Sequence, residues 1–161
     1  MRTLLVLCGM LLALGPARAG DDNGALLAGL VAAGEPLLAR ESALAQNAPG
    51  REAEVDEMIV AAGTRWMSDE HAFQDGLDRL LDRYRDLTPD VREGVINLIR
   101  LNNEMVNGMT ALNLCNKAEA IWEFAVASQF LDHARDDLRG RVDPGWAPDR
   151  RLDPKAPGGC R

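Results

Sequence analysis

Apolar residues recur every three or four positions along most of this chain, and no run alternates apolar and polar residues over the length of a strand. This spacing gathers apolar side chains on one face of a helix, whereas a half-buried strand needs a period of two. The clearest stripe, within residues 51–66, consists of Val55, Met58, Ile59, Ala62 and Trp66. The pattern predicts an all-α protein, a helical bundle of four or five helices with an extended, disulfide-tethered C-terminal tail.

The helix boundaries follow from capping and breaking residues. The expected helices cover about 23–46, 51–66, 69–87 and 89–138. Pro36 should break or kink the first, because proline lacks an amide donor. Ser68 is expected to cap the third helix, and Pro89 to occupy the first position of the next. Residues 89–138 form one long helix or two joined near 113–117, and typical helix lengths favour two.

The first 19 residues have the parts of a secretory signal peptide: Arg2, an apolar run over 4–14, and the Ala-Arg-Ala site at 17–19. The run is too short to span a bilayer core of ~30 Å as a helix. We expect cleavage before Gly20, with an uncleaved anchor as the alternative. The mature chain then has net charge −9, no membrane span, and a periplasmic or secreted location.

Cleavage would leave two cysteines, Cys115 and Cys160, in an oxidising compartment where thiols pair by default. They lie too far apart in sequence for a C-x-x-C redox pair, so a structural disulfide is favoured. The sequence thus divides into a signal peptide (1–19), an acidic bundle domain (20–139) and a basic tail rich in proline and glycine (140–161). The bridge would tie this tail across the bundle.

Composition and motifs argue against several classes of function. An aromatic content of 4% and a negative net charge argue against nucleic-acid binding. The chain lacks G-x-S-x-G, H-E-x-x-H, P-loop, dinucleotide and haem-attachment motifs. We therefore assign no catalytic residue, cofactor or metal. The favoured hypothesis is an exported non-catalytic interaction protein, such as an inhibitor, immunity factor, adaptor or assembly subunit, that binds a protein partner.

Two surfaces are candidates for partner binding. Four carboxylates share one face of the third helix: Asp75, Asp78, Asp82 and Asp86. This acidic strip could dock a basic partner or bind a divalent cation, or be a solvated face partly neutralised by Arg79. A second stripe, formed by Trp122, Val126 and Phe130, lies in a segment that is apolar around most of its circumference. It predicts a central helix, or an interface for a partner or a homodimer.

Polar residues on apolar faces support an alternative function. Asn102 and Asn113 fall about 20° apart on an apolar sector, so they predict a buried polar network, a helix break or a polar-ligand site. His133 has Asp136 and Asp137 at positions i+3 and i+4. The second hypothesis is therefore a bundle that binds a small ligand, a metal or haem. A hydrolase using only carboxylates is a third.

Overall fold

The computed structural model describes residues 19–48, 57–61, 64–143 and 145–150, with side chains from residue 22 and, in the third stretch, from residue 68. Its long helices are α1 (Ala19–Asn47), α3 (Thr64–Leu81), α4 (Pro89–Asn113) and α5 (Lys117–Leu138). Residues 57–61 are also helical, and a 3-10 turn, η1 (Tyr84–Asp86), precedes α4. The described residues contain no strand. The predicted all-α bundle is confirmed.

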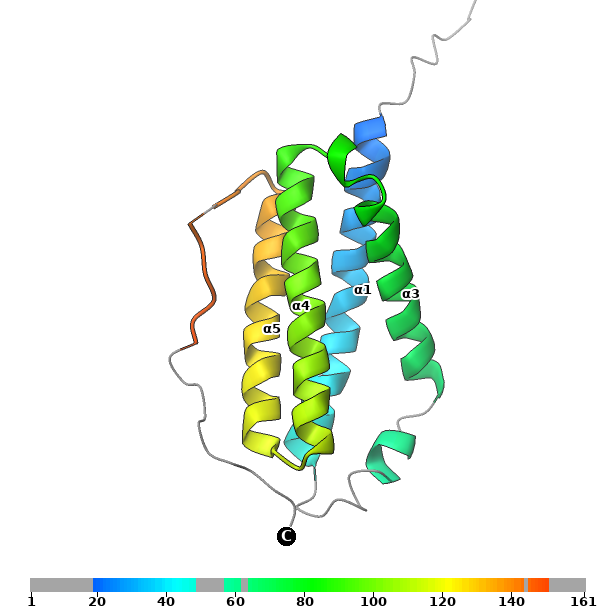
Figure 1. The fold of residues 1–161 in the computed structure, drawn as a ribbon, viewed down its shortest axis with the longest axis vertical. Coiled ribbons are helices and arrows are strands. Elements are labelled where there is room, and N and C mark those ends of the chain that lie inside the picture. Colours follow the sequence, from blue (N-terminus) through cyan, green and yellow to red (C-terminus); the bar gives the residue numbers. More distant parts are fainter. Residues whose placement is uncertain (1–18, 49–56, 62–63, 144, 151–161) are drawn as a thin grey trace, which may run out of the picture.

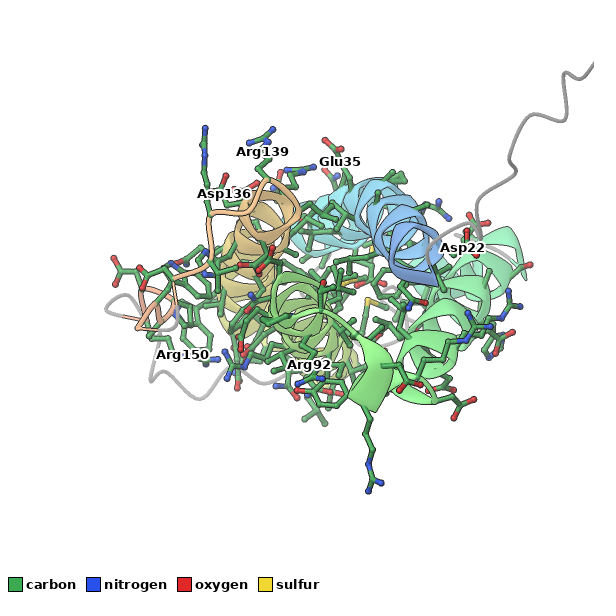
Figure 2. The ribbon with its side chains drawn as sticks, turned by 90° about the horizontal axis from the view of Figure 1, so that it is seen from above. Asp22, Glu35, Arg92, Asp136, Arg139 and Arg150 are labelled. Atoms are coloured by element: carbon green, nitrogen blue, oxygen red, sulfur yellow. The ribbon has the colours of Figure 1, made fainter. Side chains whose placement is uncertain are left out.

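Successive long helices run in opposite directions, as in an up-and-down bundle (Figure 1). The most extensive contact is between α4 and α5, and α1 packs against both. α3 lies at the edge of the bundle, mainly against α1, and its lower end diverges from α4 (Figure 1). Seen along the bundle, α3 and α5 lie on opposite sides (Figure 2). The outer faces of these two helices are therefore separate surfaces.

The four helices enclose one hydrophobic core. Its largest fully buried apolar side chains are Phe73, Phe124, Leu27, Leu37, Leu80, Leu98, Leu101, Leu112, Val95 and Val126. The α4–α5 contact is close because Gly108 faces an aromatic ring: a Cβ at that position would lie 2.7 Å from the ring of Phe124. None of the described helices has an apolar stretch long enough to cross a membrane.

α4 and α5 are two helices joined by a short turn, as the helix-length argument favoured. Cys115 adopts a φ of 57° in this turn, in the left-handed region that residues other than glycine rarely occupy. Asn116 then caps α5, because its side-chain oxygen accepts a hydrogen bond from the backbone N–H of Glu119.

Two of the expected boundaries are wrong. α3 begins at Thr64, so Ser68 lies inside the helix instead of capping it, and the helix ends at Leu81. A cap is worth only about 1 kcal/mol, and tertiary packing readily outweighs that preference. α1 continues through Pro36 without a break. The neighbouring Gly34 packs against the core, where a Cβ would lie 3.3–3.5 Å from three apolar side chains.

Beyond α5, residues 140–143 and 145–150 are largely extended and run back alongside that helix (Figure 1). We call these residues the strap. It begins at Gly140, which has a φ of 71° and so allows the chain to reverse direction. The rest of the predicted tail, 151–161, lies outside the described residues.

Candidate functional site

The strap is fixed to α5 by aromatic and polar contacts. The Trp146 ring stacks on His133, with ring centroids 4.1 Å apart, and meets Phe130 edge-on at 5.3 Å. Gln129 and Asp149 form two hydrogen bonds: the Asp149 N–H donates to Gln129 Oε1 at 2.7 Å, and Gln129 Nε2 donates to the Asp149 carbonyl at 3.3 Å. The strap therefore covers the part of α5 that carries Gln129, Phe130 and His133.

The predicted apolar stripe of Trp122, Val126 and Phe130 is largely buried. Val126 is 1% exposed and Phe130 is 3% exposed, while Trp122 is half-buried. The Arg150 guanidinium lies over the Trp122 ring, 5.3 Å from its centroid. Val126 and Phe130 belong to the hydrophobic core, and the strap contacts Phe130 and Trp122. A role for the stripe in partner binding or homodimerisation stays a prediction, and it would require the strap to move.

Beside Trp122, two glutamates from different helices meet in the α4–α5 interface. Glu104 is 6% exposed and Glu123 is 7% exposed, and Arg150 forms an ion pair with Glu104. Burial, followed by the hydrogen bond and charge of Glu104, raises the pKa of Glu123 to about 8, although Arg150 opposes the shift. At neutral pH Glu123 therefore keeps its proton and donates a hydrogen bond to Glu104. Arg150 places a positive charge beside the two carboxyl groups.

A second buried polar pair joins the same helices nearer the other end. Asn97 Nδ2 donates a hydrogen bond of 2.7 Å to Oδ2 of Asp137, which is 1% exposed. Burial raises the pKa of Asp137, while the Asn97 hydrogen bond and the charge of His133 oppose the shift. His133 is therefore close to Asp137, as its spacing predicted. No cluster of three or more metal-ligating side chains suited to a metal ion occurs among the described residues.

The predicted asparagine network is not the one that the structure contains. Asn113 is exposed and Asn102 is half-buried, whereas the buried asparagine of α4 that pairs across helices is Asn97. The apolar sector that includes Asn102 is covered near the start of α4, where Val95 is fully buried. Farther along α4 the same sector becomes more exposed, because α3 diverges from α4 (Figure 1). A network role for the two predicted asparagines finds no support in this burial pattern.

The acidic strip lies on the opposite side of the bundle. All four carboxylates are exposed: Asp75 and Asp78 in α3, Asp82 just after it, and Asp86 in η1. None of them forms an ion pair within the described part of the chain, and the possible partner Arg79 is not paired with Asp75. Among the residues that the structure describes, the strip is therefore an acidic surface without paired cations.

Asp78 also lines a surface pocket of about 270 Å³ between α3 and α4. Leu77, Leu81 and Ile99 supply its apolar lining, and Asn102 contributes an amide. Leu81 is 41% exposed, and Val106, one turn along α4 from Asn102, is 44% exposed. The acidic strip thus borders a partly apolar groove.

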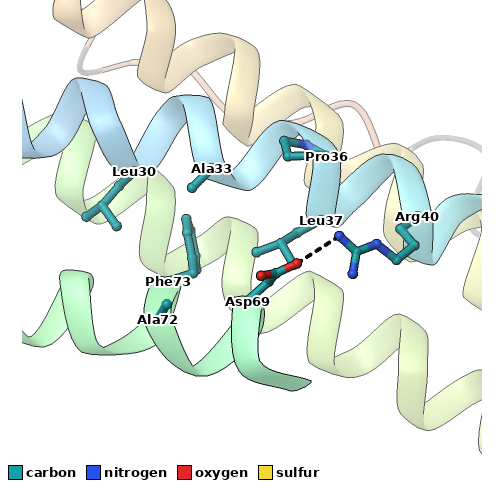
Figure 3. A pocket seen from close by; sticks show the side chains of 8 residues that line it. All are labelled: Leu30, Ala33, Pro36, Leu37, Arg40, Asp69, Ala72 and Phe73. Carbon is teal, nitrogen blue, oxygen red and sulfur yellow. Dashed lines mark hydrogen bonds and ion pairs between the residues drawn. The ribbon is translucent and has the colours of Figure 1, made fainter. Parts of the chain in front are cut away.

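A separate pocket of about 300 Å³ lies between α1 and α3 (Figure 3). Leu30, Leu37 and Phe73 make its lining largely apolar. At one end, Arg40 and Asp69 form an ion pair of 3.1 Å. The pocket therefore combines an apolar body with a charged end.

Cys115 is half-buried in the α4–α5 turn, and Cys160 lies outside the described residues, so their disulfide stays a prediction. No known protein family, curated protein or solved structure matches this chain.

Proposed function

We propose that this protein is an exported, non-catalytic interaction protein that binds a protein partner through the α3–α4 side of the bundle. The observation that carries the proposal is the acidic strip, whose exposed carboxylates have no cationic partner within the described residues and lie beside the α3–α4 groove. Residues 68–86 contain six acids and three arginines, so the surface is negative overall.

The expected partner presents a basic, amphipathic helix. Its apolar residues would enter the groove at Leu77 and Ile99, and its basic residues would face Asp78 and Asp82. An apolar groove with a charged rim suits this mode of recognition, since burial supplies affinity and the rim supplies orientation and rate of association.

Site-specific photo-crosslinking tests the surface. A photoreactive amino acid at position 78 should crosslink to a protein from the extracytoplasmic fraction of the source cells, whereas the same group at position 132 should not. The purified partner should then bind the Asp78→Lys/Asp82→Lys variant at least tenfold more weakly than the parent protein, with an affinity that falls as salt rises.

Asp132→Lys is the matched control, because Asp132 is also exposed but lies on α5. It should change the affinity less than twofold. Equal affinities for the α3 double variant and the parent protein would refute the proposed surface.

Export is the other half of the proposal and rests on the signal-peptide pattern of residues 1–19. Intact-mass analysis of the protein from the extracytoplasmic fraction should find a chain that begins at Gly20. A chain that retains its first residues would contradict export by cleavage.

The α1–α3 pocket favours small-ligand binding as a second candidate function. Its volume and apolar lining suit a compact amphipathic molecule, and Arg40 offers a cation to an anionic head group. Decanoate is a suitable probe, followed by calorimetry. Ala33→Leu, which adds volume at the lining, should abolish binding, whereas Ala39→Leu, outside the lining, should not. Absence of decanoate binding to the parent protein would remove this candidate for acyl carboxylates.

A further inference from the structure

Arg150, the last described residue of the strap, contacts groups that are typical of a recognition site. The guanidinium of Arg150 lies against the face of the Trp122 indole and pairs with the buried carboxylate of Glu104, which is backed by Glu123. Arginine is well suited to such a place, because its planar cation stacks on aromatic rings and bonds to carboxylates. Figure 2 shows Arg150 on the side of the bundle away from α3.

The three residues around Arg150 belong to the helices and not to the strap. Glu104 comes from α4, and Trp122 and Glu123 come from α5. Arg150 is the only one of the four groups that comes from an extended surface segment, and its side chain remains 46% exposed.

Several polar groups of the site make no hydrogen bond to Arg150. One oxygen of each glutamate and the indole N–H of Trp122 are buried without a hydrogen-bond partner in the described structure. The Trp122 N–H in particular has no acceptor within the described residues, which is unfavourable in a buried position. Glu123 further lines a pocket of about 320 Å³ with Asn107 and Thr110, which extends the polar surface beyond Arg150.

We propose that Trp122, Glu104 and Glu123 form an arginine-binding site that the strap occupies in cis, and that displacement of the strap opens it to an arginine of a partner polypeptide. The partner segment would be extended, and it would place an aromatic residue four positions before the arginine, as Trp146 precedes Arg150 in the strap. A backbone carbonyl of the partner could accept the free Trp122 N–H. This site is separate from the acidic strip and does not depend on it.

The test uses the full chain with Arg150→Ala, which empties the site and leaves its three walls unchanged. The first probe is N-acetyl-arginine amide, and its matched control is N-acetyl-citrulline amide, which has the same shape without the charge. The second probe is the peptide Arg-Val-Asp-Pro-Gly-Trp-Ala-Pro-Asp-Arg, the sequence of residues 141–150. The NMR signal of the Trp122 indole N–H, assigned with Trp122→Phe, reports on occupancy.

The arginine amide should shift the Trp122 signal of Arg150→Ala. The peptide should shift it at lower concentration in Trp146→Ala/Arg150→Ala, where its tryptophan can also take the place of Trp146 against Phe130 and His133. The wild-type protein should bind both probes at least tenfold more weakly, because Arg150 competes for the site. Glu104→Gln in the Arg150→Ala background should weaken binding at least tenfold. Equal shifts with citrulline, or no shift in Arg150→Ala, would overturn the proposal, and so would equal affinities of wild type and variant.

Failure of the proposed acidic surface would leave these results unchanged, because Asp78→Lys/Asp82→Lys should bind the peptide as the parent does. If Arg150→Ala loses helix content by circular dichroism, Arg150→Gln replaces it in the same measurements with the same expected outcomes.

Discussion

The indole ring of Trp146 stacks on the imidazole ring of His133, with planes 17° from parallel, although the two residues belong to an irregular segment and a helix. The same indole meets Phe130 edge-on. Aromatic pairs of this kind contribute about 0.5–1.5 kcal/mol each beyond the area that they bury. Trp146 is therefore the main apolar anchor of the strap.

Replacing Trp146 with alanine should detach the strap while the bundle stays folded, because Trp146 is only partly buried at the edge of the core and the fully buried side chains all come from the helices. Amide hydrogen exchange in residues 141–150 should become at least tenfold faster, and exchange within α4 should change little. Trp146→Phe, which retains an aromatic ring, should show an intermediate effect. Unchanged exchange in the strap would contradict the anchoring role.

Glu123 should make the protein less stable as pH rises. Its pKa is about 8 when folded and 4.5 when exposed, so between these values the folded state binds more protons than the unfolded state. The free energy of unfolding should then fall with increasing pH, by at most about 1.4 kcal/mol per pH unit from this group. Glu104, Arg150 and Glu119 are the charged groups that act on it.

Urea unfolding between pH 5 and pH 8 measures this dependence. Glu123→Gln should flatten the profile, and any slope that the raised pKa of Asp137 adds has the same direction. A wild-type profile that rises through this range would show that the Glu123 carboxyl is ionised in the fold.

The Asn97–Asp137 pair should show strong energetic coupling. Asn97→Leu leaves the buried Asp137 carboxyl without its donor and should cost about 1–3 kcal/mol of stability. The double variant Asn97→Leu/Asp137→Leu should cost less than the two single changes added together, because it removes both polar groups. Urea denaturation of the four proteins gives the coupling energy, and simple additivity would contradict the buried contact.

Gly108 should tolerate no side chain. Gly108→Ala would place a methyl group against the Phe124 ring and should destabilise the protein by about 1–3 kcal/mol. Gly29→Ala is the matched control, since α1 leaves open space at that position, and it should stabilise the protein by up to about 1 kcal/mol. Thermal unfolding compares the two, and equal melting temperatures would contradict the close α4–α5 approach.

Much of the fold could be predicted from the sequence, because helical periodicity reports which face each helix buries. Phe73, Leu77 and Leu80 recur at helical spacing on α3, and all three are buried. The exposure of Asn113 could not be predicted, because it depends on the divergence of α3. The start of α3 was missed for a related reason, since local capping preference at Ser68 is weaker than packing.

The buried carboxyl pair was also missed, because a glutamate on an apolar face resembles an interruption of the pattern. A signal was nevertheless present: Asn97 and Glu104 are seven residues apart on α4 and flank the apolar Leu101. Residues at that spacing share one helical face, so this face combines polar side chains with the apolar Leu101. Their partners, Asp137 and Glu123, required the structure.

The left-handed backbone at position 115 makes a cysteine in the α4–α5 turn unexpected. Glycine would adopt this conformation without steric conflict with a Cβ, and asparagine would tolerate it better than most residues. On backbone grounds alone cysteine is a poor choice there. The predicted disulfide would explain a cysteine at this position, and Cys115→Gly should preserve the turn while removing the sulfur.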